Sequence, residues 1–116
     1  MKRGDIYLVS LDPTLGHEQQ GSRPVVVISA TEFNQATKLP VVCPITSRIR
    51  PFGSSVVLPA GSPIEGEILV AQMRTLDTLA RPLRFSGMKI DLTLLSAVRR
   101  KIAFLCGVSA NDLAAA

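Results

Sequence analysis

Two short segments near the N-terminus carry apolar side chains on both of their faces. In Asp5–Leu11 the residues alternate so that Ile6 faces one side and Tyr7 the other, and both sides are apolar. Pro24–Ala30 is almost continuously β-branched, as buried strands often are. A strand that is apolar on both faces must pack against other parts of the protein on both faces. We therefore expect these segments to be central strands of a closed sheet or barrel.

Clusters of turn residues divide the following chain into further short strands. These are predicted at Pro40–Thr46, Ser54–Leu58 and Glu67–Thr75, with a short sixth piece near Gly87–Ile90. Between the second and third strands, Thr31–Asn34 is predicted as a helical turn with Thr31 as its N-cap. A basic loop, Arg48–Gly53, follows the third strand.

One long amphipathic helix closes the chain. Asp91 suits its N-cap and Gly107 its C-terminal stop. The residues of its apolar face are Leu94, Leu95, Val98, Ile102 and Leu105. We expect the tail after about residue 108 to fray. Several short strands and one terminal helix predict a mainly β fold: a small, strongly bent β-barrel with the helix packed on it, in a single domain over residues 1–116.

Charge and hydropathy narrow the class of protein. Thirteen Lys and Arg against nine Asp and Glu give a net charge of +4, which fits a polyanionic partner without requiring one. The mean hydropathy of +0.30 is high for so small a domain. No apolar run of about 18 residues offers a membrane span. We therefore expect apolar surface to be buried between subunits.

The cysteine and histidine content argues against a disulfide framework and against a zinc site. Cys43 lies in a predicted strand and Cys106 at the end of the predicted helix, where small buried thiols are expected. One histidine cannot complete a zinc site with two separated thiols. The N-terminus lacks a signal-peptide pattern. We expect a cytoplasmic protein that needs no metal or cofactor.

The loop Gly16–Pro24 gathers side chains that can move a proton and hold a phosphate. It contains His17, Glu18, two glutamines and Arg23 within a few residues of the apolar second strand. An imidazole or a carboxylate can transfer protons, and a guanidinium binds phosphate oxygens. Loops on a rigid scaffold often carry such sites. The alternative interpretation is a solvated turn.

Several short motifs follow one another along the chain. They are Arg3-Gly4-Asp5-Ile6-Tyr7, Leu11-Asp12-Pro13-Thr14, Gly16-His17-Glu18-Gln19-Gln20-Gly21, Arg23-Pro24, Phe33-Asn34, Pro44-Ile45-Thr46-Ser47 and Gln72-Met73-Arg74-Thr75-Leu76-Asp77. With the terminal helix, this ordered set resembles the MazF/PemK (Kid-like) toxins of bacterial toxin–antitoxin systems. The resemblance covers Met1 to about Gly107.

The resemblance implies an SH3-like (CcdB/MazF-like) barrel that forms a homodimer. It also implies the toxin of a type II toxin–antitoxin system, a metal-independent and sequence-selective endoribonuclease that arrests growth. Such a toxin cuts single-stranded mRNA by attack of the 2′-hydroxyl, leaving 2′,3′-cyclic phosphate and 5′-hydroxyl ends. The implied partners are RNA and a cognate antitoxin with a disordered tail, with DNA reached only through the antitoxin and no membrane involved.

Four residues are candidates for catalysis. Arg23 would stabilise negative charge on the phosphate, and Thr46 would direct its hydroxyl to the same phosphate. The matching residues of the family lie at its catalytic centre. Glu18 and His17 are candidates for proton transfer, and the sequence leaves open which of them acts. The alternatives are an Arg23 that pairs with a nearby carboxylate and a Thr46 that only serves its strand.

RNA recognition is expected to fall to loop residues and to the fifth strand. The predicted RNA-binding residues are Gln19, Gln20, Ser47, Arg48, Arg50, Phe52, Gln72 and Arg74. The arginines would follow phosphates, the aromatic ring would stack on a base, and the amides would contact base edges. The alternatives are Phe52 as a buried anchor of its loop and Arg74 as the ion-pair partner of Asp77.

Two positions depart from the family pattern. Members usually carry an acidic residue or its amide just before the glutamine that matches Gln72, and this chain has Ala71, which cannot transfer a proton. Kid-like members also have an arginine where this chain has Leu69. Two alternatives therefore stay open: a weak or inactive toxin that still binds an antitoxin, and a CcdB-like gyrase poison. The Arg23-Pro24 and Thr46-Ser47 motifs argue against the second.

Overall fold

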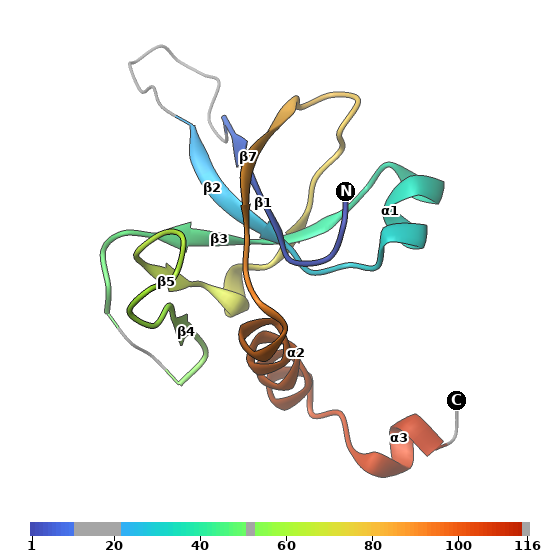
Figure 1. The fold of residues 1–116 in the computed structure, drawn as a ribbon. Helices are drawn as coiled ribbons and strands as arrows, with labels where there is room; N and C mark the ends of the chain where they lie inside the picture. Colours follow the sequence, from blue (N-terminus) through green and yellow to red (C-terminus); the bar gives the residue numbers. More distant parts are fainter. Residues whose placement is uncertain (11–21, 51–52, 115–116) are drawn as a thin grey trace.

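A bent antiparallel sheet forms the body of the protein, and one long helix packs below it in the view of Figure 1. The computed structural model describes residues 1–10, 22–50 and 53–114. The strand order is β4-β5-β3-β2-β1-β7, with β6 as a further partner of β3. The strands are β1 (Asp5–Val9), β2 (Arg23–Val27), β3 (Val41–Thr46), β4 (Val56–Val57), β5 (Glu67–Ile68), β6 (Arg74–Thr75) and β7 (Leu83–Lys89). The helices are α1 (Thr31–Thr37), the 3-10 helix η1 (Val70–Gln72), α2 (Leu92–Cys106) and α3 (Ala110–Ala114).

The two faces of the sheet bury separate apolar clusters. The first includes Val26 and Cys43 and packs against α2 through Val98. The second, on the other face, consists of Val9, Val25, Val27, Val42 and Leu76. Successive residues of β2 thus enter opposite clusters, which confirms the prediction of a strand that is covered on both sides. Each buried valine contributes about 1.5 kcal/mol or more to folding.

The segment predicted as one continuous fifth strand is divided into β5, η1 and β6. Ile45 of β3 pairs with Ile68, and Val42 pairs with Arg74. Between these pairs β3 advances by three residues (45 − 42 = 3), while its partner advances by six (74 − 68 = 6). The surplus residues cannot stay in the ladder, and Val70–Gln72 leaves it as a turn of 3-10 helix. The prediction was wrong because the first η1 side chain enters the core beside α2.

β7 is longer than the short sixth piece that the sequence predicts near Gly87–Ile90. It pairs with β1, and the register shifts between Ile6 and Tyr7. At this bulge Gly87 has a φ of +84°, which is costly for a residue with a side chain. Ser86 donates its hydroxyl to the carbonyl oxygen of Ile6 at 2.5 Å. The bulge interrupts the alternation of side chains between the two faces of β7. The sequence pattern therefore predicts only the second half of this strand.

The helix α1 extends to Thr37, and its N-cap is Ala30 rather than Thr31. Ala30 makes no side-chain cap hydrogen bond. Asn34 holds the start of the helix instead, because its Nδ2 donates to the carbonyl oxygens of Met1 and Ser29, both at 3.1 Å. The predicted cap was wrong because a buried residue inside the helix supplies the polar contacts.

Both ends of α2 confirm the predicted boundaries. The Asp91 side chain accepts the N–H of Leu94 at 2.8 Å, a cap contact worth about 1 kcal/mol. Gly107 ends the helix with a φ of +69°. Between them Leu94, Leu95 and Val98 are buried against the sheet. Within the described ranges, no helix combines the length and the apolar content that a bilayer crossing demands.

The chain continues beyond α2 into the short helix α3, which projects away from the sheet (Figure 1). Ser109 and Asp112 form a reciprocal cap: the Asp112 carboxylate accepts the Ser109 N–H at 2.7 Å, and the Ser109 hydroxyl accepts the Asp112 N–H at 3.3 Å. The Asp112 carboxylate accepts both the backbone N–H and the hydroxyl of Ser109, and these two bonds lower its pKa from the usual range. None of the α3 residues is buried, so local capping rather than packing defines this helix.

Alkylation should distinguish the two thiols. Cys43 is fully buried, and burial raises its pKa to about 12. Cys106 is exposed, which contradicts the expected buried thiol, because the last turn of α2 extends past the core. At about pH 8, iodoacetamide should modify Cys106 and spare Cys43 in the folded protein, as read by peptide mass spectrometry. Equal modification before unfolding would contradict this burial.

Candidate active site

Four of the predicted site residues line one hollow on the sheet. The hollow has a volume of about 340 Å³, and its lining residues are Arg23, Pro44, Ile45, Thr46, Leu69, Gln72 and Arg74. The lining comes from β2, from β3 and from the divided segment between β5 and β6. Two guanidinium groups, one hydroxyl and one amide thus surround a space with an apolar floor. This composition suits a ligand that has both anionic and flat, partly apolar parts.

Strand pairing brings Arg23 and Thr46 together. The pairing of β2 with β3 ends at Val25 opposite Pro44, and Arg23 and Thr46 each lie two residues beyond this pair. Because side chains two residues apart in a strand lie on the same face, both belong to the face of Val25 and Pro44, where they line one hollow. Arg23 is exposed and Thr46 half-buried. Their side chains are therefore held by regular backbone structure while they stay open to a ligand.

The Thr46 hydroxyl is oriented by the residues that follow it. Its Oγ1 accepts a hydrogen bond from the backbone N–H of Arg48 at 3.1 Å. A hydroxyl that accepts one bond still has its hydrogen to donate. Thr46 can therefore direct an O–H toward an anion in the hollow, opposite the guanidinium of Arg23.

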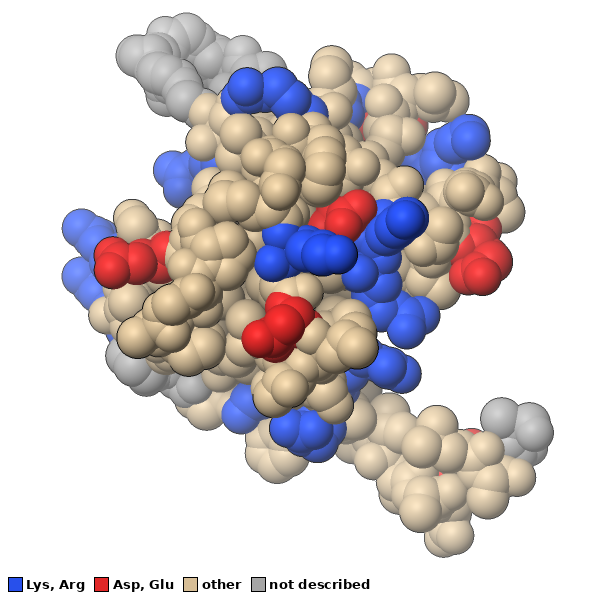
Figure 2. Space-filling model, in the orientation of Figure 1, with Lys and Arg blue, Asp and Glu red and all other residues tan. Residues whose placement is uncertain are grey.

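Neither arginine of the hollow pairs with a carboxylate within residues 1–10, 22–50 and 53–114. The alternative pairing of Arg74 with Asp77 is not formed, since Asp77 instead accepts the N–H of Leu79 at 2.9 Å. On the side of the molecule that Figure 2 shows, Lys and Arg are scattered among acidic side chains rather than collected in one basic patch. The local pairing of cations in the hollow, and not the overall charge, therefore favours an anionic ligand.

Gly66 sets how closely β5 approaches the end of β3. A Cβ built at Gly66 would lie 2.4 Å from the carbonyl oxygen of Thr46, and the φ of this glycine is +149°. Both facts require a residue without a side chain. Sequence reasoning missed Gly66, because its role depends on a contact with a strand some twenty residues away.

The other predicted site residues fall into two groups. Ser47, Arg48 and Arg50 are exposed on the connection after β3 and do not line the hollow. His17, Glu18, Gln19, Gln20 and Phe52 lie outside the described residues. Ala71 is exposed in η1, next to Gln72. In the part of the chain that the structure covers, no three His, Cys, Asp or Glu side chains are grouped as metal ligands.

Comparison with known proteins shows the family of this chain. Residues 2–106 match the family described as PemK-like, MazF-like toxin of type II toxin–antitoxin system, and the chain belongs to this family. It is similar to the endoribonuclease PemK of Escherichia coli, with 49% identity over 85 residues, which are 70% of this chain and 64% of that relative. It is 40% identical over 104 residues to the endoribonuclease toxin ChpB of the same species, covering 85% and 89% of the two chains.

A solved structure extends the comparison to the fold. A chain from the MazE–MazF complex of Deinococcus radiodurans is 30% identical and superposes with a TM-score of 0.81, over 94% of this chain and 98% of that chain. The free MazF of the same organism gives 32% identity and a TM-score of 0.78. The predicted family and the predicted bent β-barrel with a C-terminal helix are thus confirmed.

Substitution of Gly66 should destabilise the protein by disturbing the backbone at Thr46. Gly66→Ala forces a methyl group against the Thr46 carbonyl oxygen, and overpacking of this kind costs about 1–3 kcal/mol. We expect urea unfolding to show a loss of about 2 kcal/mol. The matched control is Gly61→Ala, since Gly61 also has a positive φ of +88° but no atom within 4 Å of its added Cβ. An equal loss in both variants would mean that only backbone strain matters.

Proposed function

We propose that this protein is the toxin of a type II toxin–antitoxin system and cuts single-stranded mRNA without a metal ion. The observation that carries the proposal is the hollow in which Arg23 and Thr46 meet at the ends of paired strands. Membership of the PemK-like, MazF-like toxin family supports it, and so do the relatives PemK and ChpB, which are named endoribonucleases.

The reaction uses a nucleophile that RNA itself supplies. The 2′-oxygen attacks the adjacent phosphorus, a new O–P bond forms, and the bond to the 5′-oxygen breaks. A base takes the proton of the 2′-hydroxyl, and an acid gives a proton to the departing 5′-oxygen. The products carry a 2′,3′-cyclic phosphate and a 5′-hydroxyl. Negative charge grows on the non-bridging oxygens, where the Arg23 guanidinium and the Thr46 hydroxyl stabilise it.

The proton transfers fall to His17 and Glu18 in this proposal. Their residue types supply an imidazole and a carboxylate, the two groups that move protons near neutral pH. In the sequence both precede Arg23, the first residue of β2, by only a few positions.

Recognition of the RNA falls to the residues around the phosphate site. Gln72 offers an amide donor and acceptor to a base edge inside the hollow. Arg74 also lines a second hollow of about 320 Å³, together with Arg81, so a strand bound in the first hollow can continue into the second past a cation. The remaining proposed RNA contacts are Gln19, Gln20, Ser47, Arg48, Arg50 and Phe52.

Cleavage of a long unstructured RNA in EDTA tests the function. The wild-type protein should give discrete fragments with 5′-hydroxyl ends, and Arg23→Ala should slow cleavage by about 100-fold or more, because the phosphate loses its charged donor. Arg99→Ala removes the same charge from the exposed face of α2 and should cut normally. Intact RNA beside trapped gyrase–DNA complexes would contradict the proposal and favour a gyrase poison.

The variant Ala71→Asp tests the departure from the family pattern. It places a carboxylate on the exposed turn beside Gln72, and we expect it to raise the rate of cleavage by about 100-fold, the lower end of what a proton-transfer group contributes. If only this variant cuts, the chain as it stands is an inactive toxin whose remaining role is to bind its antitoxin.

The partners follow from the same proposal. The toxin acts as a single domain in the cytoplasm, binds a cognate antitoxin whose disordered tail covers the RNA site, and reaches DNA only through that antitoxin. Complexes of MazE with MazF from Deinococcus radiodurans support an antitoxin partner. Large apolar side chains on its surface, among them Phe85 at 51% exposed and Leu92 at 82% exposed, support a homodimer.

The mass in solution tests the dimer. One chain has a mass of 12.4 kDa, so light scattering after size exclusion should report twice that value, 24.8 kDa. The substitution Phe85→Asp replaces the exposed ring of the Tyr7–Phe85 pair, whose centroids lie 5.3 Å apart, with a charge, and should shift the mass toward the monomer if this surface is shared. A monomeric wild-type protein at micromolar concentration would contradict the dimer.

A further inference from the structure

Glu67 is a carboxylate buried in the sheet, with only 1% of its surface exposed. Among the described residues, no other Asp, Glu, Lys or Arg side chain is buried. Removal of a carboxylate from water is costly unless hydrogen-bond donors replace the lost water. The contacts of a carboxyl group buried in this position therefore need to be explained.

Its two oxygens hold the connection between β3 and β4. Oε1 accepts the backbone N–H of Arg50 at 2.8 Å, and Oε2 accepts the hydroxyl of Ser55. Arg50 and Ser55 are seventeen and twelve residues away from Glu67 in the chain. One buried side chain thus fixes two points of the connection to the first residue of β5.

The same connection leaves the active site at Thr46. Glu67 lies directly opposite Thr46 in the pairing of β3 with β5. The Thr46 hydroxyl accepts the N–H of Arg48, and the Glu67 carboxylate accepts the N–H of Arg50. Thr46 and Glu67, which are opposite each other in the strand pair, therefore hold the backbone N–H groups of Arg48 and Arg50.

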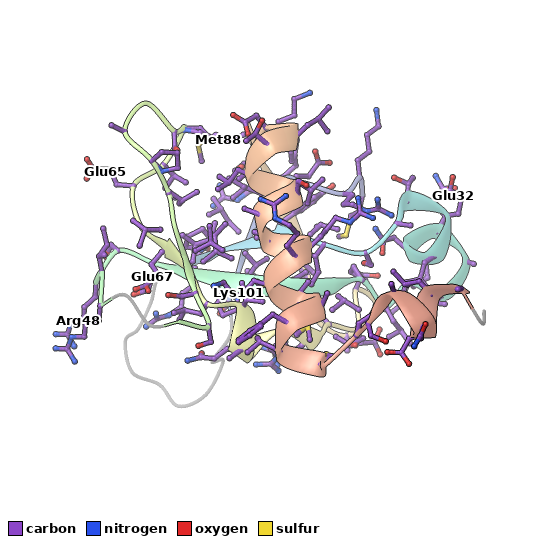
Figure 3. The ribbon with its side chains drawn as sticks, turned by 90° about the horizontal axis from the view of Figure 1, so that it is seen from below. Glu32, Arg48, Glu65, Glu67, Met88 and Lys101 are labelled. Carbon is purple, nitrogen blue, oxygen red and sulfur yellow. The ribbon has the colours of Figure 1, made fainter. Side chains whose placement is uncertain are left out.

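The arginine side chains of this connection are exposed to solvent, while its backbone is fixed by hydrogen bonds. Arg48 and Arg50 are both exposed. Figure 3 shows Arg48 projecting outward from the segment after β3, while Glu67 lies beside that segment on its inner side. The arrangement presents two cations at a set distance from the phosphate site, as a nucleic-acid surface requires.

We propose that Glu67 is a positioning residue, which sets Arg48 and Arg50 relative to Thr46 and thereby controls how tightly and at which sequences RNA is cut. The proposal rests on the ribonuclease function proposed above. Glu67 does not touch RNA, because it is buried, and it takes no part in proton transfer. Its effect therefore falls on substrate binding and sequence choice rather than on the chemical step.

Three substitutions separate positioning from a general loss of stability. Glu67→Leu removes both acceptors. Glu67→Gln keeps a carbonyl oxygen for the Arg50 N–H and an amide for the Ser55 hydroxyl, so it should rescue the function. Ser55→Ala removes the hydroxyl that Oε2 accepts and leaves in place the bond between Oε1 and the Arg50 N–H. The control is Glu65→Gln, an exposed carboxylate two residues earlier that points outward in Figure 3.

The readouts are KM and kcat on a short single-stranded RNA and the full set of cut sites on a long RNA, at temperatures where each variant is folded. Glu67→Leu should raise KM about tenfold with kcat within about threefold of wild type, and it should cut at additional sequences. Ser55→Ala should show a smaller change in the same direction. Glu67→Gln and Glu65→Gln should match the wild type.

Each outcome decides the proposal. An unchanged KM and an unchanged set of cut sites in folded Glu67→Leu would overturn it, as would a fall in kcat alone. If Glu67→Leu does not fold, Ser55→Ala decides, and wild-type behaviour of that variant overturns the proposal. A wild-type protein that fails to cut RNA overturns the proposed function itself, which is a different result from a wild type that cuts and variants that match it.

Discussion

The candidate site depends on a mismatch in length between β3 and the segment that pairs with it. Between its two pairing points this segment has three residues more than β3. Because β3 pairs with Ile68 and again with Arg74, the chain between these partners must leave the ladder. It does so as η1, which sends Val70 into the core and leaves Gln72 at the surface. Without this turn, Gln72 would belong to a regular strand. The turn thus couples the packing of the core beside α2 to the lining of the hollow.

Different residues stabilise the fold and line the candidate site. Both faces of the central strands are covered by apolar clusters, so the strand ends can carry polar side chains that make no contribution to the core. Arg23 and Arg74 lie together there without a carboxylate partner in the described part of the chain. An anion in the hollow could therefore contact both guanidinium groups. The buried carboxylate of Glu67 holds the neighbouring connection.

Local patterns in the sequence predicted much of the fold, and long-range contacts account for the rest. The valines of β2 and the caps Asp91 and Gly107 are recognisable from neighbours a few residues away. Arg23 and Thr46 were predicted from motifs, and the pairing of β2 with β3 brings them together. Gly66 and Glu67 could not be predicted, because a close approach to Thr46 and bonds to Arg50 and Ser55 exist only after β5 has packed against β3.

The structure of the protein bound to a short RNA with a 2′-O-methyl group at the cleaved nucleotide tests the central claim most directly. The methyl group blocks attack and leaves the phosphate in place. We predict that this phosphate lies in the hollow, within hydrogen-bond distance of the Arg23 guanidinium and the Thr46 hydroxyl, with the adjoining base beside Gln72. A phosphate bound elsewhere, with Arg23 and Thr46 untouched by RNA, would contradict the claim that these paired strand ends form the active site.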